Sequence, residues 1–424
     1  MNITTNFTIT HIACDASQLL ITFPITVPKW YRIAINYRNS FKAAKSNVFL
    51  DGLPFGETWF STSKVSAQKE LLEIPFTKGQ HELIVNFQNK TIVVDEVLFD
   101  EILEPMYPNP HFTLNNPAAS VEAHGLMAYL KGIYGKKILS GQQTTYTMAT
   151  ELDVINKITG KQPAVRGFDL LSYSPACDTP NQSDHCKEEI ANNQGTIEAA
   201  IDWSKNKKGI VTFCWHWFSP IKGEDKSFYS KSTNFQTSEA VIPDTPENIA
   251  LLHDIDSIAI QLKRLQDEQI PVLWRPLHEA DGDWFWWGGN PDTFKKLYRI
   301  LYDRLTNYHH INNLIWVLNA LGKDYYPGDD CVDIVSADQY PPAYCYGPLT
   351  CVHNLIVSDS QDKPAALGET GTFPSPDLIF ATKTPWLWFV TWCGGFIDSE
   401  NHTKHDFVRE VYNHPRVITL EDLQ

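Results

Sequence analysis

The sequence predicts two modules, an N-terminal β-sandwich of the jelly-roll type followed by a TIM-type (β/α)8 barrel. Residues 1–104 contain many short strand-like segments at close intervals, as is typical of sandwiches. Residues 119–424 contain eight short apolar segments that alternate with helical stretches, the pattern of a parallel sheet with helices outside it. The segment 105–118 is rich in proline and lacks a hydrophobic period, so it is predicted to be a linker.

In the first module, turn residues follow closely on each apolar segment. The sequence NVFLDG ends at Asp51 and Gly52, a pair that favours a hairpin. Trp59 and Phe60 follow Gly56 in a predicted loop, where they either offer a flat platform to a sugar or pack at a sheet edge. The predicted strands are 19–27, 30–37, 47–52, 71–76, 81–87 and 91–99.

The second module has strand segments too short and too β-branched for helices. Its clearest helices are predicted at 120–134, 246–267, 292–307 and 404–413. In a barrel of this kind the active site lies on the loops at the carboxyl ends of the strands. The eight predicted strands are 137–142, 163–171, 209–217, 270–279, 313–320, 332–340, 365–370 and 386–395.

Composition limits the classes of partner. The formal net charge of −15 argues against nucleic acid, whose phosphates would be repelled, and is compatible with a neutral polymer. The chain has no run of eighteen apolar residues, so no membrane span is expected. We expect a monomer that needs no cofactor and no metal.

Two close cysteine pairs favour an oxidising compartment. Cys177 and Cys186 bracket one short polar loop, and Cys345 and Cys351 bracket another. Such loops suggest disulfides, and zinc is disfavoured because neither pair has C-x-x-C spacing with nearby histidines. We therefore expect a secreted, extracellular protein whose signal peptide has been removed.

Two glutamates follow buried strands. Arg275, His278 and Glu279 come at the end of one strand, and Glu369 ends another. A single glutamate in such a place is more often half of a structural ion pair than a catalytic acid. A second one changes that balance, because glycoside hydrolysis needs one protonated carboxyl group and one ionised carboxylate.

The stretch WRPLHEADGDWFWWG, together with LGETG, resembles glycoside hydrolase family 26, the β-mannanases of a large retaining clan built on TIM barrels. The resemblance spans roughly residues 115–424. It implies that Glu279 is the acid/base and Glu369 the nucleophile. The N-terminal segments WYRIAINYRN, NVFLDG and FTKGQHELIVNFQNKTIVVDEVLFDE resemble carbohydrate-binding modules of family 35.

Other polar and aromatic residues gather at the same strand ends. By resemblance, Tyr340 hydrogen-bonds the nucleophile and Trp284 packs near the cleavage point. Asp169 ends the second strand, where it either hydrogen-bonds within the bowl or caps a helix. The residues expected to bind substrate are His216, His278, Trp284, Trp287, Tyr340 and Trp392.

The resemblance implies an endo-β-1,4-mannanase that cleaves mannan, glucomannan or galactomannan by double displacement. Its partners would be β-mannan polysaccharide and manno-oligosaccharides, and its two carboxyl groups would lie about 5–5.5 Å apart. Two alternatives stay open: a β-glucanase or β-xylanase of the same family, and a non-catalytic polysaccharide-binding protein. The paired acids argue against the second, because a binding protein does not need them.

Overall fold

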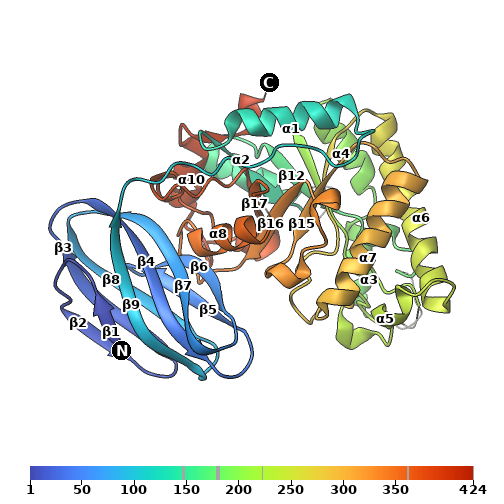
Figure 1. Ribbon diagram of the computed structural model, residues 1–424. Coiled ribbons are helices and arrows are strands. Elements are labelled where there is room, and N and C mark those ends of the chain that lie inside the picture. Colours follow the sequence, from blue (N-terminus) through green and yellow to red (C-terminus); the bar gives the residue numbers. More distant parts are fainter. Residues whose placement is uncertain (146–148, 178–181, 222, 361, 424) are drawn as a thin grey trace. The chain divides into compact units, whose positions relative to one another are not determined.

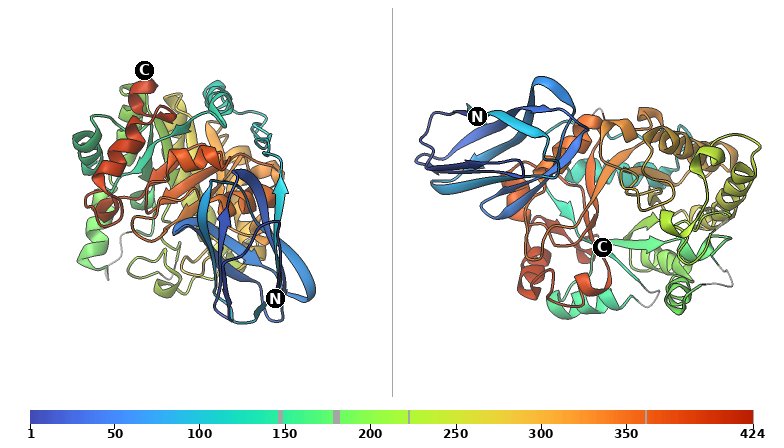
Figure 2. Two further views of the ribbon diagram at one scale, coloured as in Figure 1. Left: turned by 90° about the vertical axis from the view of Figure 1, so that its left-hand side faces the viewer. Right: turned by 90° about the horizontal axis from the view of Figure 1, so that it is seen from below.

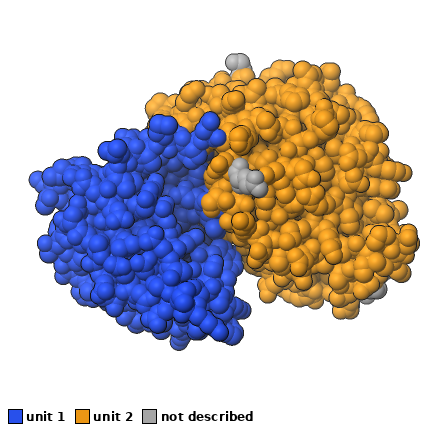
Figure 3. Space-filling model, viewed as in Figure 1, with its two compact units in different colours: residues 1–109, 341–355, 372–385 blue, residues 110–340, 356–371, 386–424 orange. Residues whose placement is uncertain are grey.

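The computed structural model describes residues 1–145, 149–177, 182–221, 223–360 and 362–423. The chain divides into two compact units (Figure 3). Unit 1 comprises residues 1–109, 341–355 and 372–385, and unit 2 comprises the rest. Unit 1 therefore contains two segments that follow barrel strands in the sequence as well as the N-terminal module.

The N-terminal module is a two-sheet β-sandwich, as predicted (Figure 1). Its strands alternate buried and half-exposed residues, because every second side chain points into one shared core. One sheet has the order β1-β9-β4-β7, formed by Asn2–Thr4, Ile92–Ile102, Lys29–Asn39 and Ser63–Phe76. The other has the order β2-β3-β8-β5-β6, formed by His11–Cys14, Gln18–Ile25, Gly79–Phe87, Ala44–Leu50 and Leu53–Phe60.

The predicted loop around Trp59 and Phe60 is instead strand β6. Phe60 is fully buried and packs edge-on against Tyr37, with ring centroids 4.8 Å apart. The sugar-platform interpretation was therefore wrong for Phe60, which belongs to the core of the sandwich.

Unit 2 contains a closed barrel of eight parallel strands, which confirms the predicted (β/α)8 class (Figures 1 and 2). Seven of the eight predicted segments contain one barrel strand each, whereas the segment 137–142 contains β10 and overlaps the barrel strand β11 only at residues 141–142. Nearly all of their residues are buried, because interior side chains fill the barrel and helices cover its outside. In barrel order the strands are β11 (Gly141–Gln143), β12 (Val165–Asp169), β13 (Ile210–Cys214), β14 (Val272–Arg275), β15 (Leu314–Asn319), β16 (Ile334–Gln339), β17 (Ala365–Thr370) and β18 (Phe389–Thr391). Strands β10 (Ile138–Leu139) and β19 (Val417–Ile418) form a small separate sheet.

The helices begin where capping residues predict. Helix α6 starts at Pro246 after Thr245, whose side chain accepts from the Asn248 N–H, and helix α7 starts at Pro291 after the Asn290 cap. Within the described residues, none of the helices combines the length with the apolarity that crossing a bilayer requires. The remaining helices are α1 (Val121–Ile133), α2 (Thr150–Thr159), α3 (Asp184–Asn192), α4 (Thr196–Lys205), α5 (Thr237–Ala240), α8 (Thr350–Asp359), α9 (Pro376–Ala381) and α10 (His405–Asn413), while α6 ends at Asp267 and α7 at Asp303.

The disulfide prediction was wrong. None of the eight cysteines, all of them described residues, is joined in a disulfide. The Cys345 thiol lies toward the Gly52 carbonyl at 3.9 Å, whereas Cys351 is buried in the sandwich core with its thiol 3.4 Å from the Leu71 carbonyl. The Cys177 thiol lies 3.5 Å from the Ser172 carbonyl. Packing thus aims these thiols at backbone carbonyls.

Candidate active site

The two glutamates singled out in the sequence lie at the carboxyl ends of the fourth and seventh barrel strands. Glu369 is in β17, and Glu279 follows β14. One carboxylate oxygen from each of Glu279, Glu369 and Asp338 lies within 4.8 Å of the others. Glu369 is buried and Glu279 is half-buried. The barrel thus brings acids from distant parts of the sequence into one cluster.

Both oxygens of the Glu369 carboxylate accept hydrogen bonds. Arg275 donates from Nη2 to Oε1 at 2.5 Å, and the Tyr340 hydroxyl donates to Oε2 at 2.6 Å. Burial, followed by the Glu369 and Asp338 carboxylates, raises the pKa of Tyr340, so its phenol stays protonated and available as a donor. The guanidinium and the hydroxyl together occupy both oxygens and fix the orientation of the Glu369 carboxylate.

Glu279 has the opposite environment. Burial, followed by the neighbouring Glu369 carboxylate, raises the pKa of Glu279 to about 7. The Trp284 indole N–H donates to Glu279 Oε2 at 2.7 Å and partly opposes this rise. At and below neutral pH a large share of Glu279 is therefore protonated and able to donate its proton.

The backbone around Glu279 is strained. Leu277 and Glu279 have φ angles of 52° and 55°, in the left-handed region that residues with side chains rarely occupy. The Glu279 N–H donates to Asn319 Oδ1 at 2.8 Å, and Asn319 Nδ2 donates to Asp338 Oδ1 at 2.7 Å. Asp338 in turn accepts from Arg275 Nη1 at 2.7 Å. A continuous set of polar contacts thus connects the Glu279 main chain to the Arg275–Glu369 pair.

Aromatic and histidine rings lie beside the acids. The His216 ring packs edge-on against His278, with centroids 4.6 Å apart, and lies 6.2 Å from the Trp392 ring. Trp284 is 43% exposed and Tyr340 44%, so both offer free surface to a ligand. Trp287 is buried, and its indole N–H donates to the His278 carbonyl at 2.9 Å. Trp287 thus helps to hold the main chain of His278, the residue before Glu279.

The model of glycosyl hydrolase family 26 matches residues 115–422. The chain belongs to glycosyl hydrolase family 26. It is 38% identical over 433 residues to a mannan endo-1,4-β-mannosidase from Thermothelomyces thermophilus, covering 97% of this chain and 84% of that protein.

Two solved mannanase structures are similar to this chain, one of them along its whole length. A Podospora anserina GH26-CBM35 β-(1,4)-mannanase matches with a TM-score of 0.72 and 33% identity, covering 100% of this chain and 95% of that one. A β-mannanase from a symbiotic protist of the termite Reticulitermes speratus, complexed with a gluco-manno-oligosaccharide, matches with a TM-score of 0.67 and 32% identity over 75% of this chain and 99% of that one. The predicted resemblance to family 26 with an N-terminal family 35-like module is confirmed.

The structure brings six of the predicted site residues together around the acids. Tyr340 and Trp284 contact the two glutamates directly. One cluster of rings contains His216, His278 and Trp392. The Trp287 ring packs against His278. Their roles toward a sugar stay predictions.

Three polar residues of this family 26 site were absent from the predicted set: Arg275, Asp338 and Asn319. All three are largely buried at the ends of strands β14, β15 and β16. Charged residues are seldom fully buried without a partner. A charged residue in an otherwise apolar strand end was therefore the signal available in the sequence for Arg275 and Asp338, whereas the uncharged Asn319 carried no such signal.

Proposed function

We propose that this family 26 protein is a retaining endo-β-1,4-mannanase that cleaves mannan, glucomannan or galactomannan. The observation that carries the proposal is the proximity of Glu369 and Glu279, whose carboxyl groups have different hydrogen-bond partners. Their carboxylate oxygens approach within 4.8 Å, compatible with the separation of about 5–5.5 Å between carboxyl groups in retaining glycosidases. The names of the relatives supply the substrate class.

In the first step, a carboxylate oxygen of Glu369 forms a bond to the anomeric carbon of the sugar. The bond between that carbon and the glycosidic oxygen breaks, and the departing oxygen takes the proton of Glu279. The contacts from Arg275 and Tyr340 hold the Glu369 carboxylate oriented for this attack. Because the pKa of Glu279 is raised to about 7, its carboxyl group still carries a proton to donate near neutral pH.

In the second step, the Glu279 carboxylate takes a proton from water, and the water oxygen attacks the same carbon. The bond to Glu369 breaks, the sugar leaves with its configuration retained, and Glu279 is again protonated. Trp284 hydrogen-bonds Glu279 and also exposes an indole face, so it is suited to pack against a sugar at the cleavage point.

Substitution of each glutamate tests the assignment. Glu279→Ala and Glu369→Ala should each lower kcat on mannan by at least about 10²–10⁴-fold, the range for general acid–base groups. Glu188→Ala, on the exposed face of helix α3, is the matched control and should keep wild-type turnover. Near-normal turnover in either active-site variant would exclude the assignment.

The stereochemistry and the substrate need separate assays. Proton NMR of the first product should show the β-anomer; a first-formed α-anomer would indicate inversion. Reducing sugar should appear on mannan and glucomannan faster than on xylan or mixed-linkage glucan, with an early fall in viscosity. Binding to mannan without release of reducing sugar would identify a binding protein.

The proposal includes a secreted, monomeric enzyme. A polysaccharide cannot cross a membrane unaided, so an enzyme that acts on it works outside the cell. The missing disulfides remove the argument drawn from the paired cysteines. Detection of the native protein in culture medium tests the location, and its mass by light scattering tests the monomer.

A further inference from the structure

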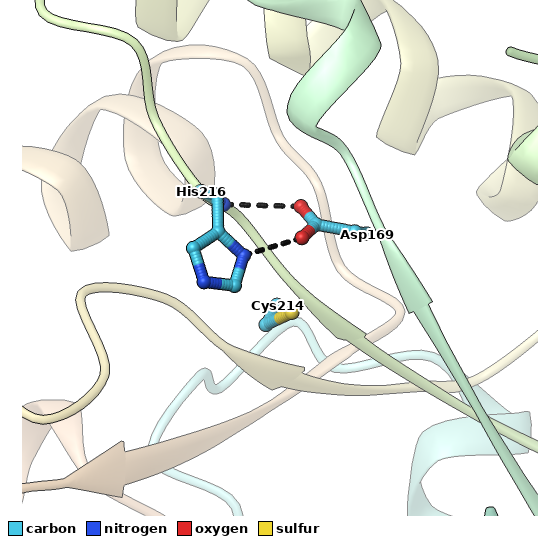
Figure 4. A group of neighbouring side chains, drawn as sticks. All are labelled: Asp169, Cys214 and His216. Atoms are coloured by element: carbon cyan, nitrogen blue, oxygen red, sulfur yellow. Dashed lines mark hydrogen bonds and ion pairs between the residues drawn. The ribbon is translucent and has the colours of Figure 1, made fainter. Parts of the chain in front are cut away.

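A carboxylate–imidazole pair lies at the ends of strands β12 and β13 (Figure 4). Asp169 Oδ2 lies 2.5 Å from His216 Nδ1, and Asp169 Oδ1 accepts from the His216 backbone N–H at 3.0 Å. Oδ1 also accepts from the Leu171 N–H at 2.9 Å. The Asp169 carboxylate therefore fixes both the main chain and the ring of His216.

This contact determines which ring nitrogen carries hydrogen. An ionised carboxylate only accepts hydrogen bonds, so Nδ1 of His216 must donate. The other nitrogen, Nε2, points away from Asp169 (Figure 4). Around the ring lie Phe228, His278, Phe285 and Trp392, and His216 keeps 14% of its side chain exposed. Because Nδ1 is engaged by Asp169, Nε2 is the ring nitrogen that can contact a ligand.

Charges around the ring favour its protonated form. Burial lowers the pKa of His216, but Asp169 outweighs it and raises the pKa, with smaller contributions from Glu369 and Glu189. His278 faces the ring and stays neutral, because burial, His216 and Arg275 hold its pKa well below the usual range. The two histidines, whose rings meet edge to face, therefore favour different charge states.

We propose that Asp169 is a positioning residue that holds the His216 ring with Nδ1–H on its carboxylate, so that Nε2–H is a fixed donor to a sugar hydroxyl. This inference rests on the proposed glycosidase function and assigns a task to a residue that does not touch the substrate. A hydrogen bond from the partner on the far side of a functional histidine sets both its tautomer and its orientation.

Cys214 completes the group but does not share in the pair. Cys214 is the last residue of β13 and pairs with Asp169 of β12 in the sheet. Its thiol is buried, and its Sγ lies 3.6 Å from the carbonyl oxygen of Phe168. Carboxylate, imidazole and thiol could together ligate a soft cation. Both carboxylate oxygens and Nδ1 already bond to protein groups, however, so we assign the pair to positioning.

Two measurements test the proposal. In protein labelled with 15N-histidine, the His216 signal, identified with His216→Gln, should show hydrogen on both ring nitrogens at neutral pH. Asp169→Asn should convert it to a neutral ring. Asp169→Asn should also lower kcat/KM on a manno-oligosaccharide on the order of 10- to 100-fold, as expected for losing a hydrogen bond to a charged group.

A double-mutant cycle separates positioning from general support of the fold. If Asp169 acts through His216, adding Asp169→Asn to His216→Gln should cost little more than His216→Gln alone. Additive losses would overturn the proposal, as would a neutral His216 in the wild-type spectrum. Cys214→Ala is the control for a buried change beside the pair and should leave the His216 signal unaltered.

These outcomes are independent of the proposed function. The His216 signal is recorded without substrate, so it stands even if Glu279→Ala and Glu369→Ala keep activity. Conversely, if Glu279→Ala and Glu369→Ala abolish activity but His216 is neutral, the proposed function stands and only the role of Asp169 is refuted.

Discussion

Replacing Trp284 by phenylalanine tests how the proton on Glu279 is controlled. The Trp284 N–H donates to the Glu279 carboxylate, and of the contacts that lower the pKa of Glu279 it is the strongest. Burial and the Glu369 carboxylate act in the opposite direction and bring the pKa to about 7. Loss of the donor should therefore raise the pKa further.

The size of the shift follows from the contact. A hydrogen bond to a charged group contributes about 1.5–3 kcal/mol, and one pH unit corresponds to about 1.4 kcal/mol. Trp284 is 43% exposed, so water replaces part of the lost bond, and we expect a rise of roughly half a unit to one unit. Because the protonated form of Glu279 is the active acid, activity is lost as the pH rises through its pKa. The alkaline limb should therefore move to higher pH.

The assay is the pH dependence of kcat/KM, which reports ionisations of the free enzyme. Trp287→Phe is the control, because the Trp287 indole donates to the His278 carbonyl and not to Glu279. An alkaline limb that stays in place in Trp284→Phe, or that moves to lower pH, would refute the reasoning about this proton.

Further predictions concern the groups around the acids. Arg275→Met removes the cation that pairs with the buried Glu369 and Asp338 carboxylates, and it should lower the free energy of unfolding by about 3–5 kcal/mol, as measured by urea denaturation. Lys29→Met, at an exposed position of strand β4, is the comparison. A smaller loss of stability in Arg275→Met than in Lys29→Met would contradict this prediction. Asn319→Ala removes the acceptor of the Glu279 N–H and should reduce kcat by about tenfold, as for one lost hydrogen bond, with KM nearly unchanged; an effect confined to KM would contradict it. Glu369→Gln removes the charge that helps to raise the pKa of Glu279, so Glu279 should titrate at lower pH in carbon NMR; an unchanged or higher pKa would show that the two acids do not interact.

The barrel and its two acids were predictable because they depend on local patterns. Eight short apolar segments sufficed for the strand count. The positions of Glu279 and Glu369 just after such segments predicted that they share one rim, because parallel strands of a barrel end at one face.

The remaining parts of the site depend on register and packing. Arg275 contacts both Asp338 and Glu369 because the carboxyl-terminal residues of β14, β16 and β17 lie close together in the barrel. The sequence of one strand does not show how it is aligned with the others. Of the two roles weighed for Asp169, hydrogen bonding at the strand ends is the one observed, since its Oδ2 contacts His216 and its Oδ1 accepts from the Leu171 N–H, whereas the N-cap of the short helix Leu171–Tyr173 is Leu170.

Spacing was misleading for the cysteines. It measures only the length of the loop between Cys345 and Cys351, whereas a disulfide needs thiols that face each other. Here the burial of Cys351 in the sandwich core turns its thiol toward Leu71.

The most direct test of the double-displacement account is to trap its covalent intermediate. Incubation with a 2-deoxy-2-fluoro mannobiosyl fluoride, followed by protease digestion and mass spectrometry, should place one glycosyl group on the peptide that contains Glu369. A label on Glu279, or complete inactivation without any glycosyl group on the Glu369 peptide, would contradict the account.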